Sequence, residues 1–293
     1  MRIRNCKKLF KRTFIVLTIV GALFLHFYAP RFITEIKNPI LERLKGRNDL
    51  AVNSSHFNTS QLNGKEISSN SLDGLLLSSY LTYSSLDTVK GTIILLHGIR
   101  SNKESFVKLS AKLSRLGYNS VAMDSRAHGQ SEGVHCTFGI KEKHDVSELI
   151  TLLNKDENIT RNIGIWGQSL GGAIGLQSLA IDKRIEFGII ESTFSEFKLI
   201  CGDYVNYHLG FNFKPLTGYL VYRAGIIADF KPEEGDLSGY CTKIKQPVLV
   251  VHGNKDKRID IGYGHKNFDN ISSENKKFIE VDGASHLTVW KVG

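Results

Sequence analysis

Residues 165–172 read IWGQSLGG, a Gly-x-Ser-x-Gly pattern centred on Ser169 that directly follows an apolar run at residues 162–166. A serine at this spacing stands at a sharp turn from a strand into a helix, in a strained backbone conformation. Glycines two residues before and after it leave room for neighbouring backbone to pass close by. The helix behind the turn points its first N–H groups at the serine hydroxyl. The stretch therefore predicts a nucleophile at the end of a buried strand.

Short apolar strands alternate with helical segments on both sides of this turn. The predicted strands are residues 92–96, 120–123, 162–166, 187–190, 247–251 and 277–281, and the predicted helices between the first four are 105–116, 141–153 and 171–180. An Asp73-Gly74 pair marks a hairpin within residues 67–83. This alternation predicts the α/β class, with a mostly parallel sheet covered by helices on both faces. Ligands of such sheets gather at the carboxyl ends of the strands.

Two of these strand ends carry partners for a serine nucleophile. The strand at 247–251 is followed by HGNKD, which ends at Asp256, and the strand at 277–281 is followed by DGASH, which ends at His286. A serine needs a base, and the base needs an acid that fixes its tautomer. The order Ser169, Asp256, His286 is typical of hydrolases with this serine turn. We therefore predict that Ser169 is the nucleophile, His286 the base and Asp256 the acid.

Other side chains compete for these roles. Glu191, at the end of the strand 187–190, is an alternative acid, and Asp260 is another, further from the predicted turn. Three further histidines have predicted structural roles in loops or packing: His97, His128 and His252.

An oxyanion in the reaction would need two backbone N–H donors. The first predicted donor is Leu170, the residue after the nucleophile. The second is expected in the loop after His97-Gly98, at Ile99, with Arg100 as the alternative.

The N-terminus predicts a membrane anchor. Residues 1–12 carry six Lys or Arg and no Asp or Glu, which accounts for most of the net charge of +9 and argues against a nucleic-acid-binding face. Residues 13–29 hold no formally charged side chain and are just long enough to span a bilayer. A cleavage site after Ala29 is disfavoured by bulky Phe27 and by Pro30, so an uncleaved signal anchor is predicted, with a cleaved signal or a buried helix as alternatives. The basic end is then cytoplasmic and the rest of the chain lies on the non-cytoplasmic side.

The remaining chain divides into a linker and one domain. Residues 30–65 are polar and are expected to form a stalk, with a short amphipathic helix at 32–44. The folded domain is predicted at residues 66–293, with an aromatic-rich cap at about 192–243 that shapes an apolar pocket or packs on the body. The four cysteines show no metal-ligand spacing, and no metal or organic cofactor is expected.

These motifs together resemble a known family. They are His97-Gly98, the D-x-R-x-H-G-x-S stretch at 124–131, the Gly-x-Ser-x-Gly turn, Thr137-x-Gly139 followed by Glu142 and Asp145, and the loops with Asp256 and His286. The chain resembles α/β-hydrolases of the serine aminopeptidase and monoacylglycerol-lipase-like group, most closely membrane-anchored members with small caps, over about residues 65–290. Only seven residues follow His286, where such folds usually continue with a helix.

The resemblance implies an α/β-hydrolase fold with a small helical cap and catalysis through an acyl-enzyme. We expect a serine hydrolase that cleaves a carboxylic ester or thioester of a lipid-like acyl substrate and is held at the membrane by its N-terminal helix. A serine aminopeptidase-like enzyme is the alternative, and a hydrolase-fold scaffold with an unused triad is a second one.

Overall fold

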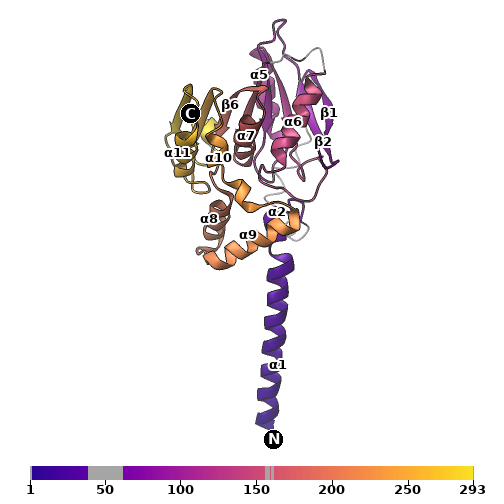
Figure 1. The fold of residues 1–293 in the computed structure, drawn as a ribbon, viewed down its shortest axis with the longest axis vertical. Coiled ribbons are helices and arrows are strands. Elements are labelled where there is room, and N and C mark those ends of the chain that lie inside the picture. The colour runs from indigo at the N-terminus through magenta and orange to yellow at the C-terminus, as the bar shows by residue number, and fades with distance from the viewer. Residues whose placement is uncertain (1, 39–61, 156–158, 160–161, 293) are drawn as a thin grey trace.

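A computed structural model describes residues 2–38, 62–155, 159 and 162–292 (Figure 1). Residues 39–61 of the predicted linker, and with them residues 39–44 of the helix expected at 32–44, lie outside the described residues. In the described part of that expected helix, residues 32–34 are helical and Glu35 is extended.

Eight strands form one sheet, in the order β1-β2-β4-β3-β5-β6-β7-β8. The strands are β1 (Gly64–Asn70), β2 (Leu76–Thr82), β3 (Gly91–Leu96), β4 (Tyr118–Met123), β5 (Ile163–Gln168), β6 (Ile185–Glu191), β7 (Val248–Gly253) and β8 (Lys276–Val281). The hairpin β1–β2 is antiparallel and joins β4 antiparallel, whereas all pairs from β4 to β8 are parallel. The predicted mostly parallel sheet is confirmed.

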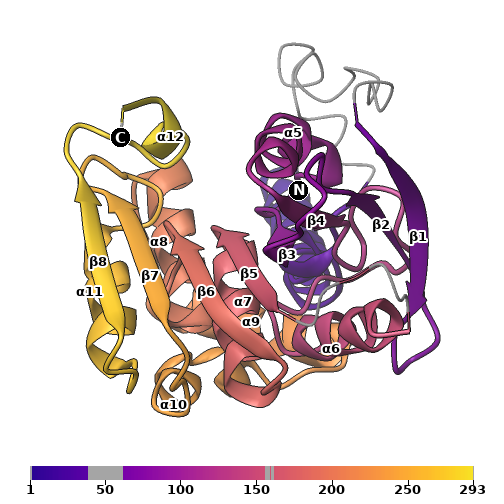
Figure 2. The same ribbon diagram turned by 90° about the horizontal axis from the view of Figure 1, so that it is seen from above.

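Helices cover both faces of the sheet, as predicted (Figure 2). One face carries α6 (Glu142–Leu153), α7 (Leu170–Ile181) and α11 (Ile261–Asn270), and the other carries α5 (Val107–Arg115) and the short α12 (Val289–Val292). Because strand side chains alternate between faces, Ile94 and Leu96 of β3 join the main apolar cluster, while Ile93 and Leu95 join a second cluster with Phe106 on the α5 side. A 3₁₀ turn, η3 (Lys103–Phe106), leads into α5.

The cap follows β6 and lies between it and β7 in the chain. It consists of α8 (Phe197–Leu209), α9 (Lys214–Ala228), a 3₁₀ turn η4 (Pro232–Gly235) and α10 (Ser238–Cys241). Figure 1 shows α8 and α9 at the end of the globular body from which the N-terminal helix leaves.

The N-terminal segment forms α1 (Arg2–Leu23), a π-helical turn η1 (Phe24–Tyr28) and α2 (Arg31–Thr34). The stretch Lys8–Thr34 is long and apolar enough to cross a membrane. Residues 31–38 differ from the linker expected there, because they pack on the body. The Cys136 N–H donates to the Thr34 carbonyl at 2.9 Å, and Ile36 is buried in the main apolar cluster.

A buried ionic cluster joins the hairpin, the loop after β4 and α6. Arg126 follows β4 and donates to both carboxylate oxygens of Asp145 on α6, at 2.6 and 2.7 Å, and to both of Asp73 in the hairpin turn, at 2.9 and 3.1 Å. Arg126 and Asp145 are almost fully buried, so this guanidinium has little water to replace a lost partner.

Replacing Asp145 with Asn should therefore lower the free energy of unfolding by about 3 kcal/mol or more, because a buried cation would lose its nearest carboxylate. Urea unfolding of the full chain in detergent, followed by tryptophan fluorescence, measures the change. Glu233→Gln is the control, since the exposed Lys198–Glu233 pair contributes about 1 kcal/mol or less. Equal effects of the two substitutions would contradict the role assigned to the buried cluster.

Candidate active site

Ser169 lies on the turn between β5 and α7 in a strained conformation, with φ 55° and ψ −117°. Its N–H donates to the Glu191 carbonyl at 2.8 Å, and its own carbonyl accepts from Thr193 Oγ1 at 2.7 Å. A Cβ on Gly167 would collide with the Gly171 backbone, and a Cβ on Gly171 would collide with the Leu96 carbonyl. The glycine spacing in the sequence is thus explained by close backbone packing around the turn.

The structure brings the three predicted catalytic side chains together. His286 Nε2 lies 3.1 Å from Ser169 Oγ, and His286 Nδ1 lies 2.7 Å from Asp256 Oδ2. All three residues are buried. With its proton on Nδ1, His286 donates to the carboxylate and presents Nε2 as an acceptor for the serine hydroxyl.

Asp256 is held as a carboxylate by several donors. Its Oδ1 accepts the N–H groups of Arg258 at 2.9 Å and Ile259 at 3.0 Å, and its Oδ2 also lies 3.5 Å from His252 Nε2. Burial alone would raise the pKa of Asp256, but hydrogen bonds from His252 and His286 outweigh it and hold the pKa well below its usual value.

The two alternative acids, Glu191 and Asp260, are hydrogen-bonded to groups other than His286. Glu191 is buried and accepts from Gln168 Nε2 at 2.9 Å and from Trp290 Nε1 at 2.6 Å. Burial raises the pKa of Glu191, against the opposing effect of these hydrogen bonds. Asp260 caps α11 by accepting from the Gly262 N–H at 2.8 Å. Among these carboxylates, Asp256 is the one hydrogen-bonded to His286.

Trp290 makes two contacts near the site that the sequence did not predict. Its ring packs on Trp166 of β5 with 4.4 Å between ring centroids, while its indole N–H reaches Glu191. It therefore fastens the segment after His286 to the neighbouring strand ends. The sequence shows an aromatic residue four positions beyond His286. Its hydrogen-bond partner Glu191 lies 99 residues away in sequence, so the pattern around Trp290 could not identify the contact.

The predicted oxyanion donors lie beside the serine. Leu170 is the first residue of α7, where a helix N–H has no intrahelical acceptor. A Cβ built on Gly98 would lie 3.8 Å from Ser169 Oγ, so the loop that holds Ile99 passes next to the nucleophile. Both Leu170 and Ile99 line the cavity described below. Their donor role remains a prediction.

Two further histidines near the site, His97 and His128, are buried in loops. His97 Nδ1 bonds to the Gly98 carbonyl at 2.8 Å, and its Nε2 accepts the Ser125 N–H at 3.2 Å. His128 Nδ1 lies 2.9 Å from the Arg126 carbonyl. Burial lowers the pKa of both rings, that of His128 to about 3, so both are neutral near pH 7. His97 and His128 thus order the loops rather than exchange protons with the serine.

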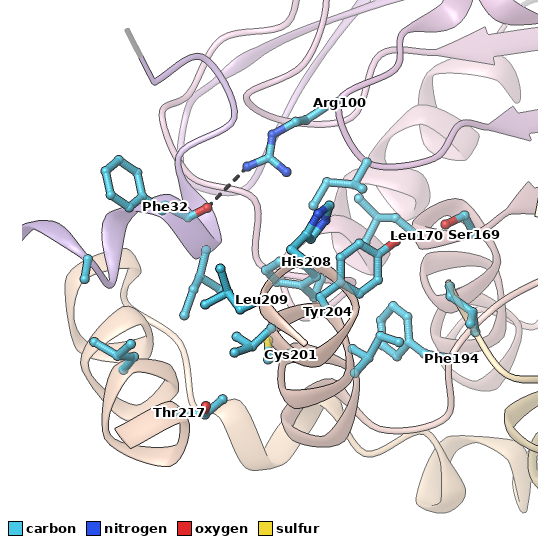
Figure 3. A pocket seen from close by; sticks show the side chains of 18 residues that line it. Phe32, Arg100, Ser169, Leu170, Phe194, Cys201, Tyr204, His208, Leu209 and Thr217 are labelled. Carbon is cyan, nitrogen blue, oxygen red and sulfur yellow. Dashed lines mark hydrogen bonds between the residues drawn. The ribbon is translucent and has the colours of Figure 1, made fainter. Parts of the chain in front are cut away.

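An apolar cavity of about 510 Å³ opens onto Ser169 (Figure 3). Its walls come from the cap, from Ile99 and Leu170, and from the end of the N-terminal helix. The cap contributes Phe194 and side chains of α8 and α9, including Tyr204 and Leu209. The volume lies within the ~300–1,000 Å³ typical of small-molecule sites. Within the described part of the chain, no group of three or more His, Cys, Asp or Glu could hold a metal ion.

Comparison with known proteins identifies the fold family. Residues 87–193 match the family model described as serine aminopeptidase, S33. An esterase of Pyrococcus furiosus superposes with a TM-score of 0.64 at 22% identity, over 78% of this chain and 85% of the esterase. The chain has the α/β-hydrolase fold. Its predicted resemblance to α/β-hydrolases is confirmed, and the membrane-anchored character stays a prediction.

A further solved structure and two curated relatives extend the comparison. Acetyl xylan esterase 1 of Thermoanaerobacterium sp. JW/SL YS485 shares the fold with a TM-score of 0.61 at 19% identity, over 79% of this chain and 80% of that one. The protein YqkD of Bacillus subtilis is 25% identical over 206 residues, 68% of this chain and 66% of YqkD. Thiohydrolase aneE of Aspergillus aculeatus is 30% identical over 113 residues, 36% of each protein. The hydrolase thus spans less than two thirds of the length of these two curated relatives.

The lowered pKa of Asp256 predicts a pH dependence of stability. A carboxylate whose folded pKa lies below its unfolded value of about 3.9 stabilises the fold above that value, and the contribution is lost as the pH falls toward the folded pKa. Between about pH 6 and pH 3, the free energy of unfolding should therefore fall more for the wild type than for Asp256→Asn. Urea titrations at each pH measure both slopes. Parallel slopes would show that Asp256 has no stabilising charge.

Proposed function

We propose that this hydrolase cleaves a carboxylic ester or thioester of a lipid-like acyl substrate, with Ser169, His286 and Asp256 as its catalytic triad. The observation that supports this most is the continuous hydrogen-bonded path from Asp256 through His286 to Ser169, which ends at the apolar cavity.

The chemistry follows from this arrangement. Ser169 Oγ attacks the carbonyl carbon while His286 Nε2 takes its proton, and Asp256 stabilises the imidazolium that forms. The N–H groups of Leu170 and Ile99 hold the negative oxygen of the tetrahedral intermediate. His286 then gives its proton to the leaving alcohol or thiol, which leaves an acyl group on Ser169. A water molecule, deprotonated by His286, releases the acid and restores the serine.

The lining of the cavity favours an acyl chain over a peptide. The family model that matches residues 87–193 is named for an aminopeptidase, and such an enzyme must bind a positively charged amino terminus. Among the described residues that line the cavity none is acidic, and Arg100 adds positive charge. A thiohydrolase among the relatives and esterases with the same fold are consistent with acyl transfer. A peptidase is therefore the second candidate.

We further propose that residues 13–29 anchor the enzyme in a membrane, with residues 1–12 in the cytoplasm and the catalytic body on the opposite side. The proposal is supported by the apolar Lys8–Thr34 helix, which projects from the body in Figure 1, and by the positive charge that precedes it.

A fluorophosphonate probe should label the wild-type chain in isolated membranes and should not label Ser169→Ala, because the probe needs an activated serine. Gel fluorescence with quantification of the chain measures labelling. A folded wild type that stays unlabelled, or a Ser169→Ala variant labelled equally well, would support the scaffold alternative.

A separate experiment tests the orientation of the chain in the membrane. A membrane-impermeant form of the same probe, added to spheroplasts, should label Ser169 to the same extent before and after lysis. Labelling that appears only after lysis would place the catalytic body in the cytoplasm.

Replacing Asp256 with Asn should lower kcat by about 10⁴-fold, because the His286 tautomer is no longer fixed. Glu191→Gln is the matched control and should change kcat by less than about 10-fold, since Glu191 bonds to Gln168 and Trp290 rather than to His286. Turnover of p-nitrophenyl butyrate measures both. A larger loss in the Glu191 variant would reverse the assignment of the acid.

A further inference from the structure

The end of the N-terminal helix forms part of the cavity that leads to Ser169. Ala29, Phe32 and Ile33 line this cavity together with side chains of α8 and α9. Figure 3 shows Phe32 on the opposite side of the cavity from Ser169, with Leu209 and His208 of α8 between them. The helix therefore contributes a wall of the binding site as well as an anchor.

This wall is fixed to the loop next to the nucleophile. Arg100 directly follows Ile99, has a φ of 58°, and donates from Nη2 to the Phe32 carbonyl at 3.2 Å. On the other side, the Thr34 carbonyl accepts the Cys136 N–H and Thr34 Oγ1 lies 3.0 Å from His135 Nδ1. Residues 32–34 are thus held in place from two loops of the catalytic body.

The cavity reaches the surface of the body at the end of α8. Leu209, the last residue of α8, lines the cavity and is still 64% exposed, so it stands at the opening. The connection from α8 to α9 and the outer face of α9 expose further large apolar side chains, namely Phe211, Phe213, Tyr219 and Tyr222. Exposure of such an apolar surface to water is energetically unfavourable, whereas aromatic residues are typical of the interface between lipid and water.

The same surface is continuous with the proposed membrane helix. His26 Nδ1 lies 2.6 Å from the Tyr219 hydroxyl, and Arg223 on α9 reaches the His26 carbonyl at 3.4 Å. Figure 1 shows α9 across the end of the body where α1 leaves it. A bilayer that surrounds α1 would therefore begin next to α9 and next to the opening of the cavity.

We propose that the substrate is a long-chain acyl amphiphile of the membrane that holds α1, and that it enters the site sideways from the bilayer, with its chain against Ala29, Phe32 and Ile33. This inference rests on the proposed function, because it names the substrate class for the same serine. The acyl chain of the substrate stays in apolar surroundings throughout, first in lipid and then in the cavity. No apolar surface therefore has to cross water to reach Ser169.

Cross-linking tests this directly in the full chain, reconstituted in phosphatidylcholine vesicles. The probe is hexadecyl fluorophosphonate with a diazirine in the middle of its chain, which first bonds to Ser169 and then cross-links under ultraviolet light. Mass spectrometry should find cross-links to peptides that contain residues 29–33. Cross-links confined to other parts of the chain, with Ser169 labelled, would overturn the inference. If the probe gives no labelling that requires Ser169, the proposed function is contradicted, and the inference is contradicted with it.

A substitution that fills the wall gives an independent measurement. Ala29→Trp should lower the ratio of kcat/KM for p-nitrophenyl palmitate to that for p-nitrophenyl butyrate by about 10-fold or more, because the long chain loses its space. Ile19→Trp, on an exposed part of α1 outside the cavity, is the matched control and should leave the ratio unchanged. An unchanged ratio in a folded Ala29→Trp variant would contradict a chain-binding role for this wall.

Discussion

The site depends on one sterically demanding turn, in which Ser169 takes a positive φ that L-residues rarely adopt. Such a conformation persists only when the surroundings over-determine it. Here the Ser169 N–H and carbonyl are both bonded, to the Glu191 carbonyl and to Thr193 Oγ1. The adjacent glycines let the backbone of β3 and α7 close around the turn. The strain keeps the hydroxyl above the sheet, where His286 can reach it.

The parallel sheet then explains why residues so distant in sequence meet. Strands β5, β7 and β8 run in the same direction, so Ser169, Asp256 and His286 all follow carboxyl ends at one edge of the sheet. Each loop after these strands has its own support. Asp256 accepts two backbone N–H groups of its own loop, while Trp290 bonds to Glu191 beyond the histidine. Hydrogen bonds within the surrounding loops therefore hold the three side chains in their positions.

The sequence predicted the parts of this arrangement that local pattern controls. Apolar β-branched runs located β3 to β8, and the spacing around Ser169 located the turn, because both depend on neighbours in the chain. Position and chain order favoured Asp256, after β7, over Glu191, at the end of β6, but did not exclude Glu191. Excluding Glu191 required its hydrogen-bond partners, one of which, Trp290, follows the histidine itself. The packing of residues 31–38 was also missed, because polar composition suggests a linker and the contacts of Ile36 and Thr34 are with distant residues.

The docking of residues 31–38 sets the boundary of the folding unit. Ile36 belongs to the main apolar cluster, and the Thr34 carbonyl satisfies the buried N–H of Cys136. A shortened protein that starts at Glu66, where the regular sequence pattern begins, would leave a hole in that cluster and an unsatisfied amide at Cys136. A shortened protein that starts near Pro30 would keep both contacts. The folding unit therefore begins at the exit of the helix rather than at β1.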